Sequence, residues 1–143
     1  MNKLNRENLT IIDLISEQHL VLRKLVEDRW MEISNIEFSH TEWFLLSKTE
    51  QESLTISKAA TLIGISRQAM QKCAKKLEER GYINFFYKKD NKRDKYIVLT
   101  ETGRDCCNKN NNLKKRIENE IIENIGNVKV KDFKELLKKD WLK

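Results

Sequence analysis

The chain has 143 residues, of which 35% are charged, and it carries a formal net charge of +6 with no Pro and only four Gly. This length supports one well-buried core, and the low Pro and Gly content favours a mostly helical protein. The polar N-terminus is unlike a signal peptide, no run of 18 apolar residues predicts a membrane span, and three Cys and two His lack disulfide or metal-ligand spacing. We therefore expect a cytoplasmic protein with one domain, residues 1–143, no metal site, no cofactor and no membrane partner.

A long helix is predicted from about Asn8 to Ser34, because its apolar residues recur at alternating steps of three and four. A main stripe and a neighbouring second stripe together comprise Ile12, Ile15, His19, Leu22, Val26, Trp30, Ile33, Ile11, Leu14, Val21 and Leu25. The combined arc is wider than one packing face needs. It indicates a helix that packs on its own domain and on a twin subunit.

A second helix begins with a capping box. Ser39 is placed to cap it, Glu42 can reach back, and Phe38 can pack on Trp43. We expect this helix to run to about Thr49.

Two further helices form a helix-turn-helix. Thr55 is placed to cap a helix from Ile56 to Ile63, with inward residues Ala59, Ala60, Leu62 and Ile63. Gly64 separates this helix from a second one, which Ser66 can cap and Gly81 can end in a left-handed conformation.

The second helix of this pair has two distinct faces. At about 100° per residue, one arc holds Arg67, Gln71, Lys75, Gln68, Glu79 and Lys72, and the opposite arc holds Ala69, Cys73, Leu77, Met70 and Ala74. Arg, Gln and Lys are side chains that reach base edges and phosphates. The pattern is typical of a recognition helix.

A change of period from 3.6 to 2 follows Gly81. It predicts strands from Ile83 to Tyr87 and from Tyr96 to Leu99, joined by the basic loop Lys88–Asp94. Directly after a recognition helix, such a strand pair is typical of a wing. The alternative is an ordinary hairpin with a solvated tip.

The charge distribution supports the same interpretation. From Arg67 to Lys95 there are ten Lys and Arg against four Asp and Glu, a local excess of +6 that equals the formal charge of the whole chain. This concentration favours a nucleic-acid partner over a merely Lys-rich surface.

Two more helices complete the chain. Thr100 is placed to cap a helix to about Ile125, whose hydrophilic middle, residues 107–116, is expected to project into solvent. A last helix, from Lys131 to Leu142, carries an apolar stripe of Phe133, Leu136, Leu137 and Trp141. The fold class is therefore mainly α with a small β wing: a winged helix-turn-helix at residues 36–100 flanked by N- and C-terminal dimerisation helices, residues 1–35 and 101–143.

This order of elements resembles that of the MarR family of regulators over essentially the whole chain. The family typically shows a serine-capped recognition helix that ends in LEexGxI, then a wing with Asp and Arg running into LTxxG. The matching segments here are ISRQAMQKCAKKLEERGYI and NKRDKYIVLTETG. Arg93 matches the wing arginine, although the wing is about two residues shorter than usual and has Asn91 where Asp is frequent.

The resemblance implies a homodimeric transcription factor that binds a pseudo-palindromic operator in double-stranded DNA. Such proteins are often repressors released by a small molecule or by thiol oxidation. An effector pocket between the dimer helices and the winged helix is also implied, with candidates His19, Arg23, Trp30 and Trp43. The alternative is that these four are ordinary core or surface residues. Cys73 is predicted to be a small core residue.

Individual DNA roles follow from side-chain chemistry. Arg67, Gln68 and Gln71 lie in the first turns of the recognition helix and suit base edges. Arg93 is the candidate for minor-groove insertion. Phosphate contacts are expected from Thr55 or Ser57 and from Lys72, Lys75, Lys88, Lys89, Lys92 and Lys95.

Two other function classes fit the sequence less well than DNA-binding regulation. An enzyme is disfavoured because no catalytic motif is present, and the two histidines, His19 and His40, fall on different predicted helices. A winged-helix protein-interaction module, such as an antitoxin or adaptor, would expose apolar residues where the recognition helix carries Arg, Gln and Lys.

Overall fold

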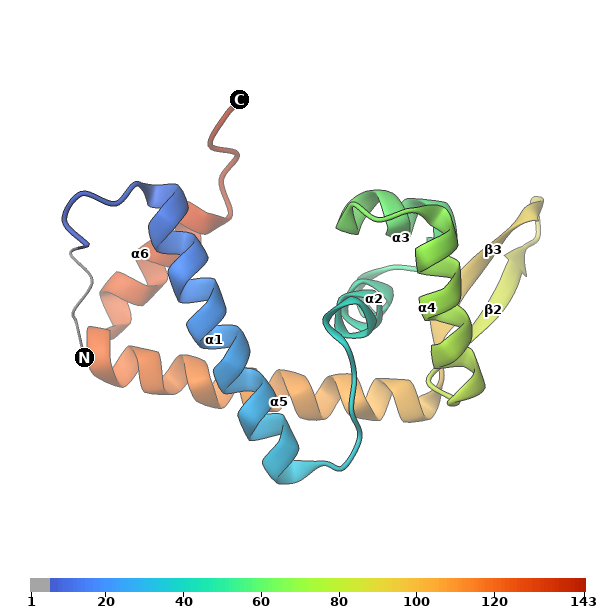
Figure 1. The fold of residues 1–143 in the computed structure, drawn as a ribbon, viewed down its shortest axis with the longest axis horizontal. Coiled ribbons are helices and arrows are strands. Elements are labelled where there is room, and N and C mark those ends of the chain that lie inside the picture. The colour runs from blue at the N-terminus through green and yellow to red at the C-terminus, as the bar shows by residue number, and fades with distance from the viewer. Residues whose placement is uncertain (1–5) are drawn as a thin grey trace. The chain divides into compact units, whose positions relative to one another are not determined.

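The structure, a computed structural model, describes residues 6–143, and the chain divides into two compact units. The winged-helix unit comprises Glu37–Asn112, and the described part of the terminal-helix unit comprises residues 6–36 with Leu113–Lys143. The described residues are mainly helical with a small antiparallel sheet, which confirms the predicted fold class (Figure 1). None of the described helices has the length and apolar character needed to cross a membrane.

The winged-helix unit contains six elements and the start of a seventh. They are α2 (His40–Gln51), β1 (Leu54–Thr55), α3 (Ile56–Ile63), α4 (Arg67–Glu79), β2 (Ile83–Lys88), β3 (Asn91–Leu99) and the first half of α5 (Glu101–Ile125). The strands lie in the order β1-β3-β2, and both pairs are antiparallel. The sequence did not predict β1, because two residues are too few to show a strand period.

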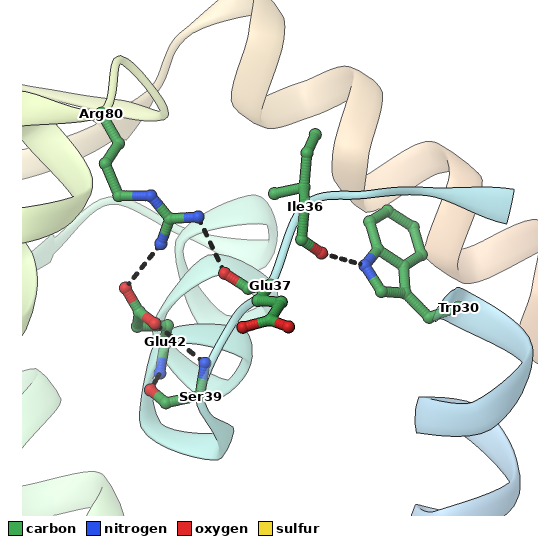
Figure 2. Close-up of polar contacts among 6 residues, drawn as sticks. All are labelled: Trp30, Ile36, Glu37, Ser39, Glu42 and Arg80. Atoms are coloured by element: carbon green, nitrogen blue, oxygen red, sulfur yellow. Dashed lines mark hydrogen bonds and ion pairs between the residues drawn. The ribbon is translucent and has the colours of Figure 1, made fainter. Parts of the chain in front are cut away.

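The predicted cap of α2 is confirmed. Ser39 Oγ accepts a hydrogen bond from the Glu42 backbone N–H at 3.1 Å, and Glu42 Oε1 accepts one from the Ser39 N–H at 2.8 Å (Figure 2). The rings of Phe38 and Trp43 meet with their centroids 4.7 Å apart, as expected. The helix continues to Gln51, slightly beyond the predicted end.

Helix α3 begins and ends where predicted. Thr55 Oγ1 accepts from the Lys58 N–H at 3.2 Å, and Gly64 follows in a left-handed conformation with φ 82°. The prediction that Leu62 faces inward is wrong, since it is 48% exposed. At about 100° per residue, Leu62 lies roughly 110° from the centre of the stripe through Ala59 and Ala60, beyond the reach of a narrow core face.

Helix α4 also has the predicted limits. Ser66 Oγ accepts from the Ala69 N–H at 3.0 Å, and Gly81 follows the helix with φ 86°. Met70, Ala74 and Leu77 are fully buried on its inward face. Cys73 is half-buried, while Ala69 is exposed, so the buried arc is narrower than predicted.

The wing is more completely strand than predicted. The expected seven-residue loop is wrong, because β2 extends to Lys88 and β3 begins at Asn91, which leaves two residues at the turn. Asn91 Oδ1 accepts from the Arg93 and Asp94 N–H groups at 3.0 and 3.3 Å, and Asn91 Nδ2 donates to Asp94 at 3.1 Å. The polar side chains of this segment led to the prediction of a solvated loop. Strand pairing depends instead on hydrogen bonds between backbone groups, which polar residues carry as well as apolar ones.

Helix α5 has the predicted cap, with Thr100 Oγ1 accepting from the Gly103 N–H at 3.0 Å. Gly103 is packed so closely that a Cβ would lie 2.0 Å from the Tyr82 carbonyl oxygen, so only glycine fits there. The prediction that residues 107–116 project into solvent is wrong. Cys107, Asn110 and Leu113 are each at most 5% exposed, because spacing of three residues places them on one buried face.

The terminal-helix unit contains α1 (Ile11–Ile33), the second half of α5 and α6 (Asn127–Leu137). Helix α1 starts three residues later than predicted, at a capping box of Thr10 and Asp13. Helix α6 starts and ends earlier than predicted, so Trp141 lies beyond it. Two ion pairs link the helices, Arg29 with Glu120 and Lys134 with Glu118.

Candidate nucleic-acid interface

The recognition face of α4 is polar and open. All five side chains predicted to contact DNA from this helix are exposed, namely Arg67, Gln68, Gln71, Lys72 and Lys75. The opposite face is anchored by residues with no exposed surface. Burial of that face fixes the rotation of α4 about its own axis, so the polar side chains are presented together.

A hollow of about 210 Å³ lies beside this face, and we call it the groove hollow. It is formed by the start of α3, the first turns of α4 and both wing strands. Its lining residues are Thr55, Ile56, Ser57, Arg67, Gln71, Tyr87, Arg93, Asp94 and Lys95. The structure therefore brings together six residues that the sequence assigned separately to base, phosphate and minor-groove contacts.

A second hollow of about 240 Å³ adjoins the first. Gln71 and Lys95 line both hollows, and Lys75 lines the second. The remaining lining residues of the second hollow are Ile56, Glu78 and Phe85. The concave surface therefore continues along α4 from its N-terminal turns to its last turn, at Glu78.

The wing lysines differ in whether they line the two hollows. Lys95 lies in both hollows, with its Nζ 5.7 Å from the ring centroid of Phe85. Lys88 Nζ lies 4.2 Å from the ring centroid of Tyr96. Lys89 at the turn and Lys92 on β3 are exposed but line neither hollow, and Lys72 on α4 is also outside both.

Three residues of the groove hollow were not predicted from the sequence. Tyr87 is 51% exposed and lies in the groove hollow beside Arg93, and Ile56 lies at the start of α3. The two-residue period of β2 could have found Tyr87, because it follows Phe85 on the same face. Asp94 brings one carboxylate into the groove hollow, where Asn91 donates to it.

The four effector candidates come from both units. His19 is exposed on α1, and Arg23 forms an ion pair with Glu27 at 3.7 Å. Trp30 is buried, and its indole N–H donates to the Ile36 carbonyl at 2.7 Å (Figure 2). Trp43 belongs to the winged-helix unit. Neither of the two hollows is lined by any of these four residues.

All three cysteines lie in the winged-helix unit, and the thiols of Cys73 and Cys106 are free. Burial, with a smaller contribution from the charge of Glu42, raises the pKa of Cys73 to about 11. Burial also raises the pKa of Cys106, and Cys107 is buried with its Sγ 3.8 Å from the Leu46 carbonyl oxygen. A protonated, covered thiol is a poor nucleophile. Within residues 6–143, no group of three His, Cys, Asp or Glu side chains could hold a metal ion.

Comparison with known sequences finds a matching family model and related proteins. The model of the MarR family matches residues 38–95. The HTH-type transcriptional regulator Hpr of Bacillus cytotoxicus is 32% identical over 102 residues, which cover 70% of this chain and 55% of Hpr. An uncharacterized protein of Mycobacterium tuberculosis is 36% identical over 67 residues, 46% of this chain and 47% of that protein. The chain spans about half the length of the curated relatives it matches.

Solved structures share the fold at low sequence identity. Wild-type MarR from E. coli superimposes with a TM-score of 0.74 at 16% identity, covering 92% of this chain and 97% of that one. The transcriptional regulator BldR from Sulfolobus solfataricus gives a TM-score of 0.68 at 20% identity, covering 96% and 98%. These likenesses show the fold alone.

Proposed function

The chain belongs to the MarR family of transcriptional regulators, and from that premise we propose that it is a homodimeric repressor that binds a pseudo-palindromic operator in double-stranded DNA. The observation that carries this proposal is the groove hollow. There, base-reading residues of α4 and basic residues of the wing face one concave surface. A surface with Arg and Gln at the helix start and Lys and Arg at its edges suits bases flanked by phosphates.

The roles within this surface follow from position. Arg67 and Gln71 line the groove hollow and, with Gln68, would read base edges in the major groove. Arg93 would enter the minor groove from the wing. Phosphates would be held by Ser57 or Thr55 and by six exposed lysines, namely Lys72, Lys75, Lys88, Lys89, Lys92 and Lys95.

The exposed apolar residues of the terminal-helix unit support the homodimer. In α1, Ile12 is 76% exposed and Val21 is 60% exposed; in α6, Val128 is 73% exposed and Phe133 is 54% exposed. Large apolar side chains exposed on both helices favour an isologous contact with a second copy. A twofold dimer would present two recognition helices to successive major grooves, roughly 34 to 36 Å apart.

Of the two release signals, a small molecule is favoured over thiol oxidation. Redox-sensing cysteines are exposed and have lowered pKa values. Cys73 has a raised pKa, and Cys106 and Cys107 are buried. We therefore propose release by a small molecule.

The test is to select duplexes from a random pool with the purified protein and to measure binding by fluorescence anisotropy. The selected duplex and a scrambled duplex of equal length are compared at about 50 and 200 mM salt. Preference for the selected duplex, with affinity falling by roughly 10³ over that range, supports a specific reader with several phosphate contacts. Equal binding to both duplexes would overturn sequence specificity, and no binding would favour the protein-interaction module.

Two substitutions separate base reading from phosphate contact. Arg67→Ala should cost about 1–3 kcal/mol on the selected duplex and relax the preferred sequence. Lys89→Ala should weaken all duplexes alike and lower the salt slope by about 1. An unchanged slope would remove Lys89 from the interface.

A further inference from the structure

The C-terminal end of the recognition helix is tied to the start of α2 by one side chain. Arg80, the C-cap residue of α4, donates from Nη2 to the Glu37 carbonyl oxygen at 2.7 Å and from Nη1 to Glu42 Oε2 at 3.1 Å (Figure 2). Its guanidinium carbon lies 4.9 Å from the ring centroid of Phe38 and 5.2 Å from that of Tyr82. A planar guanidinium is the group that can make two directed hydrogen bonds and also contact aromatic rings.

Glu42 connects this contact to the cap of α2. One carboxylate oxygen accepts from the Ser39 N–H, and the other accepts from Arg80. The Glu42 side chain is only 12% exposed, so water screens this ion pair less than one on an open surface. The N-terminus of α2 and the C-terminus of α4 therefore share a single carboxylate.

The aromatic residues that contact Arg80 also pack on each other. Phe38 and Tyr82 meet with ring centroids 4.9 Å apart, and Tyr82 is buried. Tyr82 is held beyond the helix by its N–H, which donates to the Leu77 carbonyl oxygen at 2.9 Å. The end of α4, its first residues beyond the helix and the start of α2 thus form one packed group.

Arg80 lies far from the base-reading residues. It is 13 residues beyond Arg67, which corresponds to roughly 20 Å along a helix. It lines neither hollow, and its two hydrogen bonds are directed to α2 and the segment before it. A helix held firmly at one end translates a small change of angle into a larger displacement at its other end.

We propose that Arg80 is a positioning residue for sequence-specific binding: through Glu37 and Glu42 it fixes the angle at which α4 presents Arg67 and Gln71. This rests on the proposed DNA-binding function. The role differs from a phosphate contact, because it would act on specific binding and leave the electrostatic attraction to DNA unchanged.

Arg80→Ala is expected to weaken binding to the selected duplex about tenfold while changing binding to the scrambled duplex less than twofold. The slope of affinity against salt should stay at the wild-type value, since no phosphate contact is lost. Glu42→Gln should reproduce the effect, because a glutamine oxygen can still accept from Ser39 while the ion pair is removed. The double variant should be no worse than either single variant, as expected for two partners in one interaction.

Lys76→Ala is the matched control. Lys76 is exposed on the last turn of α4, and its removal deletes the same unit charge without touching Glu37 or Glu42. It should leave the ratio of selected to scrambled binding at the wild-type value. Arg80→Lys, which cannot serve both acceptors at once, should fall between wild type and Arg80→Ala.

Hydrogen exchange of the free protein gives a readout that does not involve DNA. Amides of residues 38–42 and 80–82 should exchange faster in Arg80→Ala and in Glu42→Gln, with the rest of the winged-helix unit unchanged. Equal loss on both duplexes with a salt slope reduced by about 1 would make Arg80 a phosphate contact instead. If both variants keep the wild-type ratio of selected to scrambled binding and the wild-type exchange rates, the positioning role alone is overturned. If the wild-type protein prefers no duplex, the proposed function is overturned as well.

Discussion

The winged-helix unit and the terminal-helix unit bury their apolar residues very differently. In the first, Leu45, Leu46, Met70, Leu77 and Ile97 have no exposed surface. In the second, many large apolar side chains along α1 and α6 are 36–76% exposed, and the buried ones described are Trp30, Leu113, Ile117 and Val130. One unit closes its own core, while the other leaves large apolar side chains exposed, and we propose that a second copy covers them.

The largest expected effect is at the closed core. Leu77→Ala should lower the free energy of unfolding by about 2–5 kcal/mol, because it leaves a cavity among fully buried neighbours. Ile12→Ala, at a 76% exposed position, is the contrasting variant and should cost less than about 0.5 kcal/mol in dilute protein. Urea unfolding followed by circular dichroism measures both, and equal losses would contradict the difference between the units.

The reactivity of the Cys73 thiol tests how well the core of the winged-helix unit is closed. A pKa raised from 9.0 to about 11 leaves Cys73 with on the order of 100-fold less thiolate at neutral pH than an unperturbed thiol. Alkylation by iodoacetamide should therefore be slow below pH 9 and accelerate as pH rises toward 11. Cys106→Ser/Cys107→Ser protein isolates Cys73, and the same protein in urea is the control. Rapid alkylation of the folded protein at pH 7 would restore a redox signal as a candidate.

A charged residue in place of the exposed Phe133 on α6 tests the proposed dimer contact. Phe133→Glu should raise the dimer dissociation constant about tenfold or more, because a carboxylate would be buried in an apolar contact. Lys131→Glu, at a polar exposed position on the same helix, should change it little. Sedimentation velocity over a range of concentrations measures the constant. A wild-type protein that remains monomeric would remove the homodimer from the proposal.

The smallest expected effect comes from removing the same motif, a capping box, from one helix in each unit. Ser39→Ala should cost about 1 kcal/mol of unfolding free energy, because it removes the cap of a helix packed into the closed core. Thr10→Ala removes the matching capping box of α1 and should mainly increase fraying of its first turn. Thermal unfolding and hydrogen exchange distinguish the two. An equal global loss would indicate that both units unfold as one.

The sequence alone was sufficient for features built from neighbouring residues. The caps at Ser39, Thr55, Ser66 and Thr100 were all confirmed, because each involves a hydrogen bond across three residues. The two faces of α4 followed from helical period, and the wing followed from the change of period after Gly81. Local hydrogen bonds and side-chain spacing carry this information without reference to the rest of the chain.

Only the tertiary structure decided features that join distant residues. The pairing of β1 with β3, the buried face of α5 against Leu46, and the close approach of Gly103 to Tyr82 each depend on segments far apart in sequence. The two-residue turn of the wing was set by strand register, which polarity does not reveal. The Arg80 contacts span 38 and 43 residues, and no periodicity identifies such partners, because chain packing alone brings them within hydrogen-bonding distance.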